Sequence, residues 1–471
     1  MQSDTDDISP LAWPRPLAVV VLAAGRGTRM RSALPKVLHP VGGLAMVGHV
    51  LAAARRLAPA RLVVVVGAGG VAVAEAVQSL APGTVVAEQA EPRGTGHAVQ
   101  CAAGALAGFE GDLLVLYGDV PLITAETLAR LADPRLPDGS LPPVRVLGFE
   151  TPEPGGYGRL VTAPDGTLAR IVEARDATTR ERAITACNSG VMAGDAATVL
   201  RLLARLTPDN DQGELYLTDA VGLARDEGLD AVAVMGAMAE TLGINDRAEL
   251  ARAEAGFQDR ARLAAMRGGA TLTAPQTVFL AHDTVLGRDV TVGPNVAFGP
   301  GVRVEDGARI EAFCHLADTA VAGGAVIGPF ARLRGGCEIG RDTRIGNFVE
   351  MKAARFGERA KAAHLTYVGD AEVGAGANLG AGTVTCNYDG VDKHRTTIGP
   401  GAFIGTHASL IAPVTVGEGA YVATGTVVTR DVEPGALAIA RVAQDNRQGA
   451  AARLRQAMLA RQAARRAKAA G

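Results

Sequence analysis

Two groups of residues in this sequence have the types and the spacing that chemistry requires. In the first group, residues 25–29 read Gly-Arg-Gly-Thr-Arg after an aliphatic run, and Lys36 follows Arg29 at a distance of seven positions. Glycines let the backbone approach phosphate oxygens, whose charge the cationic side chains neutralise. The segment is not a Walker loop, because no Gly-Lys-Ser/Thr follows, and Met30 stands where the dinucleotide fingerprint has its third glycine. We expect a phosphate-binding turn of another kind, with a simple tight turn as the alternative.

Polar residues also follow other strand-like segments of the first half. Asp119 lies in Tyr-Gly-Asp-Val-Pro, directly after an aliphatic run. A carboxylate at a strand tip is placed to hold Mg²⁺ against phosphates, because this ion prefers hard oxygen ligands. A surface turn is the alternative reading of Asp119. The other residues of this kind are Gln89, Gly94 and Thr95 in a polar loop, and Gly158, Glu173 and Asn188 at the ends of later segments.

The second group surrounds His364, which lies in the string Ala-Ala-His-Leu-Thr-Tyr. A neutral imidazole can accept a proton from an attacking amine near neutral pH, and cationic side chains can hold a sugar phosphate. A purely structural histidine is the alternative, which is weakened by the cationic and amide groups nearby. These neighbours are Arg334, Lys352, Tyr367, Asn378, Asn387 and Tyr388.

A period of six residues organises the second half of the chain, from Val326 to Val427. Aliphatic residues recur at Ile327, Leu333, Ile339, Ile345, Val373, Leu379, Ile398, Ile404, Leu410, Val416 and Val422, and most are followed by glycine. This period predicts hexapeptide repeats that coil into a parallel β-helix, whose familiar form is left-handed. Such a fold often carries acyl transfer from coenzyme A, and a passive trimerisation prism is the alternative. We expect two interruptions on its working face, at residues 352–367 and 385–397.

The first half has a different pattern. Aliphatic runs at Leu17–Leu22, Leu62–Val66 and Leu113–Leu116 alternate with the helix-like stretches Ala45–Leu57 and Ala98–Leu106. This alternation predicts a doubly wound α/β domain. Ligands of such sheets bind beyond the carboxyl ends of the strands, so the polar segments after the three runs are expected to meet at one site.

A helix over residues 246–266 is expected to join the two halves. Asp246 and Glu249 suit a capping box at its start. Its apolar side would comprise Leu250, Phe257 and Leu263, and repeat-like sequence begins near Thr277 with Val285, Val290 and Val296. The expected parts are an N-terminal extension (1–16), an α/β domain (17–245), a linker helix (246–270), the β-helix (271–441) and a basic tail (442–471).

Composition limits the function further. The net charge of −2 argues against a general nucleic-acid or membrane-surface binder. The five cysteines include no Cys-x-x-Cys pair, so neither a disulfide framework nor a zinc site is expected. The N-terminus does not read as a signal peptide and no apolar run is long enough to span a bilayer, so we expect a cytoplasmic protein.

Both halves, in this order, resemble the bacterial family of bifunctional N-acetylglucosamine-1-phosphate uridyltransferase/glucosamine-1-phosphate N-acetyltransferase enzymes. The resemblance covers residues 17–441. Its specific segments are Leu22–Met30, Leu34–His39, Gly94–His97, Leu116–Pro121, Gly156–Arg159, Gly346–Lys352, His364–Tyr367 and Thr385–Gly390. It implies a Rossmann-like nucleotidyltransferase domain and a left-handed β-helix that forms a homotrimer, with acetyl-CoA bound between prisms.

The resemblance also implies roles for individual residues. Uridine nucleotide and sugar would bind to Leu22, Ala23, Ala24, Gly25, Lys36, Gln89, Gly94, Thr95, Tyr117, Gly118, Asp119, Gly158, Glu173, Asn188 and Asn245. Asp119 and Asn245 would hold Mg²⁺, and Arg29 would act on the triphosphate. His364 would be the catalytic base, and glucosamine phosphate would bind to Arg334, Lys352, Tyr367 and Asn378. Acetyl-CoA would bind to Ala381, Asn387, Tyr388, Thr406, Thr424 and Arg441.

Four positions depart from the family pattern. Thr406 stands where serine is frequent, and Thr424 where alanine is common. Residues 187–190 read Cys-Asn-Ser-Gly where Asn-Thr-Gly is usual, and Gly335-Gly336 replaces Pro-Gly.

The function implied is acetylation of glucosamine-1-phosphate by acetyl-CoA, followed by UMP transfer from UTP. The product, UDP-N-acetylglucosamine, would serve peptidoglycan and lipid A precursors, and the partners would be small molecules, with neither nucleic acid nor membrane. One alternative is a single-activity sugar-1-phosphate nucleotidyltransferase whose β-helix regulates or oligomerises. Another is a scaffold that senses sugar nucleotides, which the joint presence of Lys36, Asp119 and His364 makes the weaker reading.

Overall fold

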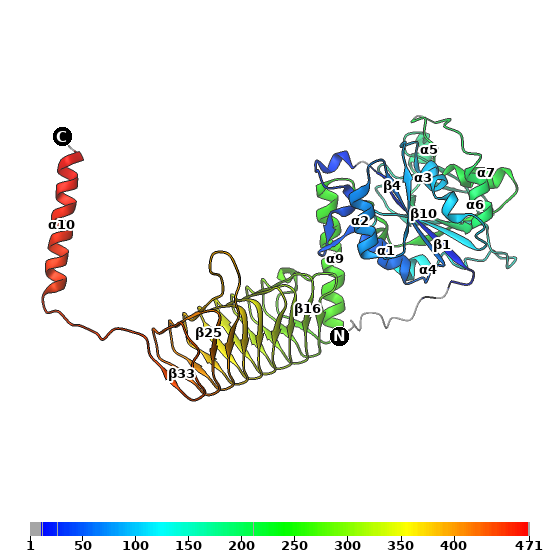
Figure 1. Cartoon of the computed structure of the whole chain (residues 1–471). Helices are drawn as coiled ribbons and strands as arrows, with labels where there is room; N and C mark the ends of the chain where they lie inside the picture. The colour runs from blue at the N-terminus through cyan, green and yellow to red at the C-terminus, as the bar shows by residue number, and fades with distance from the viewer. Residues whose placement is uncertain (1–10, 12, 26, 211, 470–471) are drawn as a thin grey trace. The chain divides into compact units, whose positions relative to one another are not determined.

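The computed structural model describes residues 11, 13–25, 27–210 and 212–469, with side chains up to 465. Contacts divide the chain into two units, shown in Figure 1. The first unit runs to Val285 and includes Ala297–Val302, and the second unit contains Leu286–Val296 and the chain from Arg303 onward. No helix among the described residues is long and apolar enough to cross a membrane.

The first unit is built on one mixed sheet, in the order β11-β7-β10-β6-β1-β4-β5. The strands are β1 (Leu17–Ala23), β4 (Arg61–Gly67), β5 (Val85–Gln89), β6 (Asp112–Tyr117), β7 (Val144–Glu150), β10 (Ala186–Asp195) and β11 (Ala231–Gly236). β1, β4, β5 and β6 are parallel, as the aliphatic runs predicted, whereas β10 is antiparallel to β6 and β7. The hairpins are β2 (Pro40–Val41) with β3 (Leu44–Ala45), and β8 (Arg159–Thr162) with β9 (Leu168–Val172).

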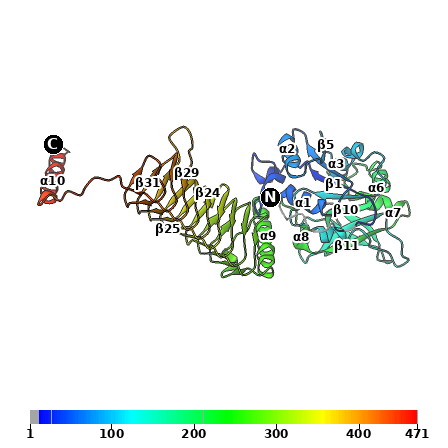
Figure 2. The same cartoon turned by 60° about the horizontal axis from the view of Figure 1, so that its bottom comes forward.

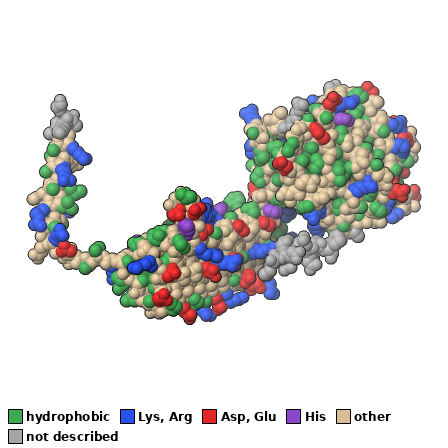
Figure 3. All heavy atoms as spheres, viewed as in Figure 1, with side chains coloured by type: hydrophobic (Ala, Val, Ile, Leu, Met, Phe, Trp, Pro, Cys, Tyr) green, Lys and Arg blue, Asp and Glu red, His purple; other side chains and the backbone are tan. Residues whose placement is uncertain are grey.

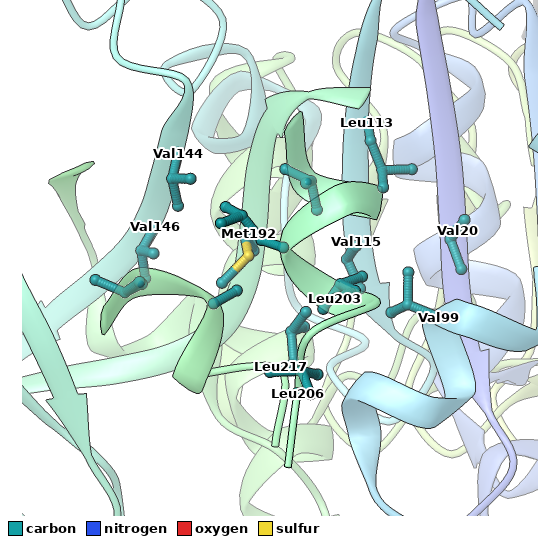
Figure 4. Close-up of a cluster of buried hydrophobic side chains, with 14 of the residues drawn as sticks. Val20, Val99, Leu113, Val115, Val144, Val146, Met192, Leu203, Leu206 and Leu217 are labelled. Carbon is teal, nitrogen blue, oxygen red and sulfur yellow. The ribbon is translucent and has the colours of Figure 1, made fainter. Parts of the chain in front are cut away.

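Successive side chains of β1 point to opposite faces of the sheet, and all of them are buried. Both faces must therefore be covered, and helices cover them. Ala18 and Val20 pack in a layer with α3 and α6, part of which Figure 4 shows, while Val19 and Val21 pack in a layer with α1 and α2. The longer helices are α1 (Met46–Arg55), α2 (Val71–Leu80), α3 (Thr95–Cys101), α6 (Ala196–Leu203), α7 (Asp219–Asp226) and α9 (Arg247–Arg267). Short helices are α4 (Ala125–Ala129), α5 (Thr179–Arg182) and α8 (Met238–Thr241). The doubly wound arrangement is therefore confirmed.

Helix α9 packs on the first unit through Ala253 and Phe257, which join a small buried cluster with Val41 and Met46. The predicted apolar side is wrong at Leu263, which is 44% exposed. The predicted capping box forms in part. The Asp246 carboxylate accepts from the Glu249 amide at 2.8 Å, but the Glu249 carboxylate accepts from the Asn245 amide at 2.6 Å.

The predicted N-terminal extension lies partly outside the described residues, which begin at Leu11 and omit residue 12. Its described part packs on the first unit: the Leu11 amide donates to the Arg56 carbonyl at 2.9 Å, and Trp13 Nε1 donates to Asp112 Oδ2 at 3.0 Å.

The second unit contains a parallel β-helix, called the prism below. Figures 1 and 2 show its stacked coils. One face stacks β14 (Thr291–Val292), β17 (Arg309–Ile310), β20 (Val326–Ile327), β23 (Arg344–Asn347), β25 (Lys361–His364), β27 (Asn378–Leu379), β30 (Phe403–Ile404), β33 (Tyr421–Val422) and β35 (Leu437–Ala438). The other faces contain β18 (His315–Leu316), β19 (Thr319–Val321), β21 (Arg332–Arg334), β22 (Cys337–Ile339), β24 (Glu350–Phe356), β26 (Tyr367–Val373), β28 (Val384–Cys386), β29 (Thr396–Ile398), β31 (Ser409–Ile411), β32 (Val414–Val416) and β34 (Val427–Val428).

The six-residue period is confirmed, since all the aliphatic residues named for it are at most 3% exposed. The predicted interruption at residues 352–367 is a shortening of the coil by one residue and not a projecting loop, because Ile327 pairs with Ile345 whereas Ile345 pairs with Ala362, one position sooner. Strands β24, β25 and β26 run through it, with the buried Ala354, Ala360 and Ala362 in place of larger aliphatic residues. The second interruption is real: Asn378 pairs with Phe403, whereas a regular coil later pairs Phe403 with Tyr421. The extra residues form a loop before β29 that projects from the prism (Figure 2).

Before the prism, Val285 is 39% exposed while Val290 and Val296 are fully buried, so the imperfect register is borne out at Val285. The tail forms helix α10 (Ala450–Ala469), whose described side chains are exposed.

Candidate active sites

The carboxyl ends of β1, β5 and β6 border one cavity of about 270 Å³. Parallel strands place their carboxyl ends at the same edge of a sheet, which is why segments far apart in the sequence meet there. The cavity is lined by predicted residues Leu22, Ala23, Ala24, Gly25, Lys36, Gln89, Gly94, Thr95, Tyr117 and Asp119, together with Val37, Pro92, Ala98 and Glu214. Gly118, between Tyr117 and Asp119, donates its amide to the Leu22 carbonyl at 2.9 Å.

Two turns carry the cationic groups of this site. Gly27 has a φ of 60°, and a Cβ atom there would lie 2.5 Å from Lys36 Cβ, so the close approach of the turns requires glycine. Arg29 donates to Asn245 Oδ1 at 2.9 Å. The Lys36 ammonium pairs with the Asp119 carboxylate and lies 3.4 Å from Asn245 Oδ1.

The side-chain oxygen atoms of Asp119 and Asn245 thus both lie beside the Lys36 ammonium. Carboxylate and amide oxygens are the hard ligands that Mg²⁺ prefers. The described residues contain no cluster of three His, Cys, Asp or Glu side chains able to hold a metal. A divalent ion here would therefore take its remaining ligands from phosphate oxygens and water, as Mg²⁺ commonly does. The donor set fits the ion expected from the sequence.

The residues expected to bind the sugar also lie close together. The backbone N–H of Asn188 donates to the Gly158 carbonyl at 2.8 Å. A Cβ atom on Gly158 would lie 3.5 Å from the Glu173 carboxylate oxygens. Gly190 has a φ of 91° and packs against the Tyr117 ring. Burial raises the pKa of Glu173 above its usual value.

One segment of this site was missed at the sequence level, namely residues 214–218. Glu214 lines the cavity, the Leu217 amide donates to Thr95 Oγ1 at 3.0 Å, and Thr218 Oγ1 donates to Glu173 Oε1 at 3.1 Å. No motif marks the segment, because its role comes from contacts with residues that lie 122 and 45 positions earlier.

The second site lies on the prism, where predicted residues stack on neighbouring strands. Arg334 pairs in register with Lys352, which pairs with Gly369. Arg334 Nη2 donates to Glu350 Oε1 at 2.7 Å, and Glu350 is the register partner of Tyr367. The coil repeat therefore brings Arg334, Lys352 and Tyr367 together, with Glu350 as a neighbour that the sequence analysis missed.

The projecting loop adds a second missed residue, Lys393. Hydrogen bonding and charge repulsion from Lys352 lower the pKa of Lys393, and Asp370 and Tyr367 oppose this shift. Asn387 donates to Asp370, and the Lys352 ammonium lies 3.8 Å from the same carboxylate. Figure 3 shows acidic, basic and histidine side chains gathered on this loop.

A pair inside the loop fixes its shape. His394 Nε2 lies 2.7 Å from Asp389 Oδ2, and Asp389 Oδ1 accepts from the Val391 and Asp392 amides at 2.8 and 2.7 Å. The hydrogen bond to His394 and those to the backbone lower the pKa of Asp389. The loop thereby presents Tyr388, which is 60% exposed.

His364 ends strand β25 and lies beside Asn347, its register partner on β23. His364 Nδ1 lies 2.7 Å from Asn347 Oδ1. An amide oxygen only accepts hydrogen bonds, so Nδ1 carries the proton in the neutral ring and Nε2 is left as the proton acceptor. The exposed His364 is thus held in the tautomer that a general base needs.

Four of the six residues expected to bind acetyl-CoA, Ala381, Thr406, Thr424 and Arg441, form a ladder along one corner of the prism, whereas Asn387 and Tyr388 belong to the projecting loop. The His407 amide donates to the Ala381 carbonyl at 2.8 Å, and the Gly425 amide donates to the Thr406 carbonyl at 2.8 Å. Arg441 Nη1 donates to the Thr424 carbonyl at 2.6 Å.

Asn378 is not brought to the glucosamine-phosphate residues of its own chain. It begins β27 beside Lys361 of β25, on a different sheet from Arg334, Lys352 and Tyr367.

Two family models match this chain, one in each half. Residues 19–186 match the family model of the MobA-like NTP transferase domain, and residues 395–430 match that of the bacterial transferase hexapeptide, six repeats. The hexapeptide match supports the left-handed form of the β-helix. The inositol-1-phosphate CTP transferase from T. maritima is similar to 51% of this chain, over 94% of its own, at 17% identity and a TM-score of 0.41.

Three relatives called Bifunctional protein GlmU match nearly the whole chain. The protein from Jannaschia sp. is 54% identical over 94% of this chain and 97% of its own. The one from Ruegeria sp. (strain TM1040) is 54% identical over 95% and 99%, and the one from Paracoccus denitrificans 54% over 94% and 98%. With this identity over both units, the chain belongs to the family of bifunctional GlmU proteins.

Proposed function

We propose that this chain catalyses two reactions. The prism transfers acetyl from acetyl-CoA to glucosamine-1-phosphate, and the first unit transfers UMP from UTP to the product, giving UDP-N-acetylglucosamine and pyrophosphate. The observation that carries this proposal is that one chain combines the Lys36, Asp119 and Asn245 cluster with the His364–Asn347 pair. The similarity to bifunctional relatives over both units favours it over a single-activity nucleotidyltransferase.

In uridyl transfer, a phosphate oxygen of the sugar phosphate attacks the α-phosphorus of UTP, and pyrophosphate leaves. Asp119 and Asn245 would hold Mg²⁺, which neutralises charge that develops on the phosphate oxygens. Arg29 and Lys36 supply further positive charge at the same edge of the sheet. Lys36, which pairs with Asp119, would bind phosphate oxygens beside the ion that Asp119 and Asn245 would hold.

In acetyl transfer, the amine of glucosamine-1-phosphate attacks the thioester carbonyl, and the carbon–sulfur bond of acetyl-CoA breaks. Nε2 of His364 accepts the amine proton, while Asn347 holds the opposite side of the ring. Arg334, Lys352 and Lys393 surround the place expected for the sugar phosphate. Repulsion between the two lysines is relieved when a dianionic phosphate binds between them.

We also propose a homotrimer. Phe313, Phe330, Phe348 and Leu365 form an exposed column on the prism, called the corner ridge below, with exposed fractions of 50, 45, 54 and 61%. The first three rings stack at centroid distances of 4.9 and 5.1 Å. A continuous exposed apolar column is typical of an association surface. It lies next to His364, so a neighbouring copy seated on it could supply the missing Asn378.

Separate assays of CoA release and pyrophosphate release test the two-site proposal. Asp119→Ala should abolish uridyl transfer, because several kcal/mol of charge stabilisation are lost, and leave acetyl transfer intact. His364→Ala should lower acetyl transfer by about 10²–10⁴-fold and leave uridyl transfer intact. Equal loss of both activities in either variant would contradict separate sites.

The trimer has its own test. Phe348→Glu introduces charge in the corner ridge and should give monomers in light scattering, with acetyl transfer lost and uridyl transfer kept. A wild-type monomer with full acetyl transfer would refute the trimer. For the cellular setting we propose the cytoplasm, where both nucleotide co-substrates are made.

A further inference from the structure

Thr218 occupies the N-cap position of helix α7 (Asp219–Asp226) but does not cap it. A threonine at this position normally accepts a hydrogen bond from the backbone of the first helical turn. The other threonine and aspartate N-caps of the first unit follow that rule: Thr124 accepts from the Thr127 amide, for example, and Asp195 from the Thr198 amide. The Thr218 hydroxyl donates instead to Glu173 Oε1, at 3.1 Å.

The Thr218 side chain is buried, although its contact with Glu173 lies at the wall of a cavity of about 480 Å³ that both residues line. Thr218 is 8% exposed. Within the described part of the chain, Thr218 is the sole hydrogen-bond donor to the Glu173 carboxylate, whose second oxygen has no protein partner. A carboxylate held through one oxygen leaves the other able to accept hydrogen bonds from a ligand.

The backbone around Thr218 is tied to the nucleotide side of the cavity. The Leu217 amide donates to Thr95 Oγ1 at 3.0 Å, and the Gly96 amide donates to the Leu215 carbonyl at 2.8 Å. A Cβ atom on Gly94 would lie 2.6 Å from the same Leu215 carbonyl oxygen, so glycine is required where the two loops meet. The Thr218 hydroxyl is therefore held at a fixed place relative to the nucleotide loop.

We propose that Thr218 is a positioning and specificity-determining residue for uridyl transfer, which orients the Glu173 carboxylate toward the hydroxyl groups of an N-acetylhexosamine phosphate. This inference rests on the proposed uridyl-transfer function and deepens it. Thr218 acts through Glu173; neither residue lines the cavity beside Thr95 and Asp119, and both line a second cavity of about 480 Å³.

The charges around Glu173 give this role a pH signature. Burial raises the pKa of Glu173, Asp219 of α7 and Asp176 of the loop after β9 raise it further, and the Thr218 hydrogen bond lowers it. Tyr117 of β6 and Tyr216 also face this carboxylate. Without Thr218, Glu173 takes up a proton at higher pH, so sugar affinity should begin to fall at a higher pH as the solution is acidified.

The test measures KM for N-acetylglucosamine-1-phosphate and for UTP across pH in the full chain. Thr218→Val keeps the shape and removes the hydroxyl, and should raise KM for the sugar phosphate about tenfold while KM for UTP and the acetyl-transfer rate stay unchanged. Its acid limb should move to higher pH. Thr218→Ser keeps a hydroxyl and should restore both quantities. Thr84→Val, which alters another buried threonine of the first unit, is the matched control.

A second measurement separates positioning from folding. In a Glu173→Ala background, which removes the acceptor, Thr218→Val should cause no further loss, because the residue acts through the Glu173 carboxylate. The inference is refuted if Thr218→Val leaves the sugar-phosphate KM and its pH profile as in the wild type. It is also refuted if Thr218→Ser behaves like Thr218→Val, or if both KM values rise equally. A wild type that makes no UDP-N-acetylglucosamine would instead refute the proposed function, and with it the inference.

Discussion

The Nδ1 atom of His364 lies 2.7 Å from the Oδ1 atom of Asn347, its register partner one coil earlier. This hydrogen bond ties the proposed base to the regular part of the prism, although His364 itself is exposed. Asn347 thus connects the repeat, which fixes its position, with the proton transfer that His364 is proposed to perform.

Substitutions of Asn347 should alter proton acceptance by His364, and therefore acetyl transfer, while the rate of uridyl transfer stays unchanged. Asn347→Ala frees the ring to adopt the other tautomer and to rotate, so acetyl transfer should slow by at least about tenfold. Asn347→Asp places a carboxylate beside the imidazole, which favours the charged ring, so the acid limb of the rate profile should move to higher pH. The measurement is CoA release against pH. An Asn347→Asp profile identical to the wild type would show that the contact does not govern the base.

Lys393 should give glucosamine-1-phosphate binding an alkaline limit. Its pKa is lowered by Lys352, so it loses its proton at lower pH than an ordinary lysine. A phosphate binds the charged form, so affinity is complete below the pKa of Lys393 and falls as pH rises through it. KM for the sugar phosphate should therefore increase with pH, and Lys393→Met should lose this dependence.

Lys352→Met provides the complementary variant. Removing the repelling ammonium raises the pKa of Lys393, so the alkaline limit should move to higher pH even though overall affinity falls. Lys361→Met, which alters an exposed lysine on another face, is the control. A limit that stays in place in Lys352→Met would contradict the coupling of the two lysines.

Much of the prism could be predicted from the sequence, because a period of six residues reports directly which side chains point inward. The prediction failed where the inward residues are small. Ala354, Ala360 and Ala362 are fully buried, yet alanine is so frequent in this chain that it gives no periodic signal. A coil shortened by one residue, with alanines pointing inward, was therefore taken for an insertion.

The nucleotide-binding edge was also predictable, since Lys36 and Asp119 follow buried strands whose ends must meet. What the sequence could not reveal are partners fixed by tertiary contacts. Thr218 contacts Glu173 because the chain returns to the sheet after α6, and Lys393 meets Lys352 because a loop folds back over the prism. No spacing in the sequence predicts either contact.

Breaking the buried ion pair of Asp112 and Arg145 should destabilise the first unit. Arg145 Nη2 donates to Asp112 Oδ2 at 2.6 Å with both side chains 1% exposed, and Arg15 and Trp13 donate to the same carboxylate. Asp112→Asn leaves the Arg145 charge buried with a neutral partner, so unfolding free energy in urea should fall by about 3–5 kcal/mol.

A surface pair supplies the control for that experiment. Asp133 and Arg135 form an ion pair with side chains 44 and 57% exposed. Asp133→Asn should change the unfolding free energy by no more than about 1 kcal/mol. If Asp112→Asn and Asp133→Asn lowered the unfolding free energy equally, the buried Arg145 charge would not depend on the Asp112 carboxylate for its stabilisation.

The position where the first unit ends can be tested with two fragments, both expected to keep uridyl transfer and to lose acetyl transfer. Within this unit, Gln258 of α9 exchanges two hydrogen bonds with the Leu280 backbone at 2.8 and 2.9 Å, and Arg262 donates to the Val278 carbonyl at 3.3 Å. A fragment that ends at Arg267 lacks these partners, whereas one that ends at Val302 keeps them. Three hydrogen bonds at about 1 kcal/mol each predict that the shorter fragment melts roughly 6–12 °C lower.

Equal melting temperatures in calorimetry would mean that the unit already ends with helix α9. A longer fragment that folds but is inactive would mean that uridyl transfer needs the prism.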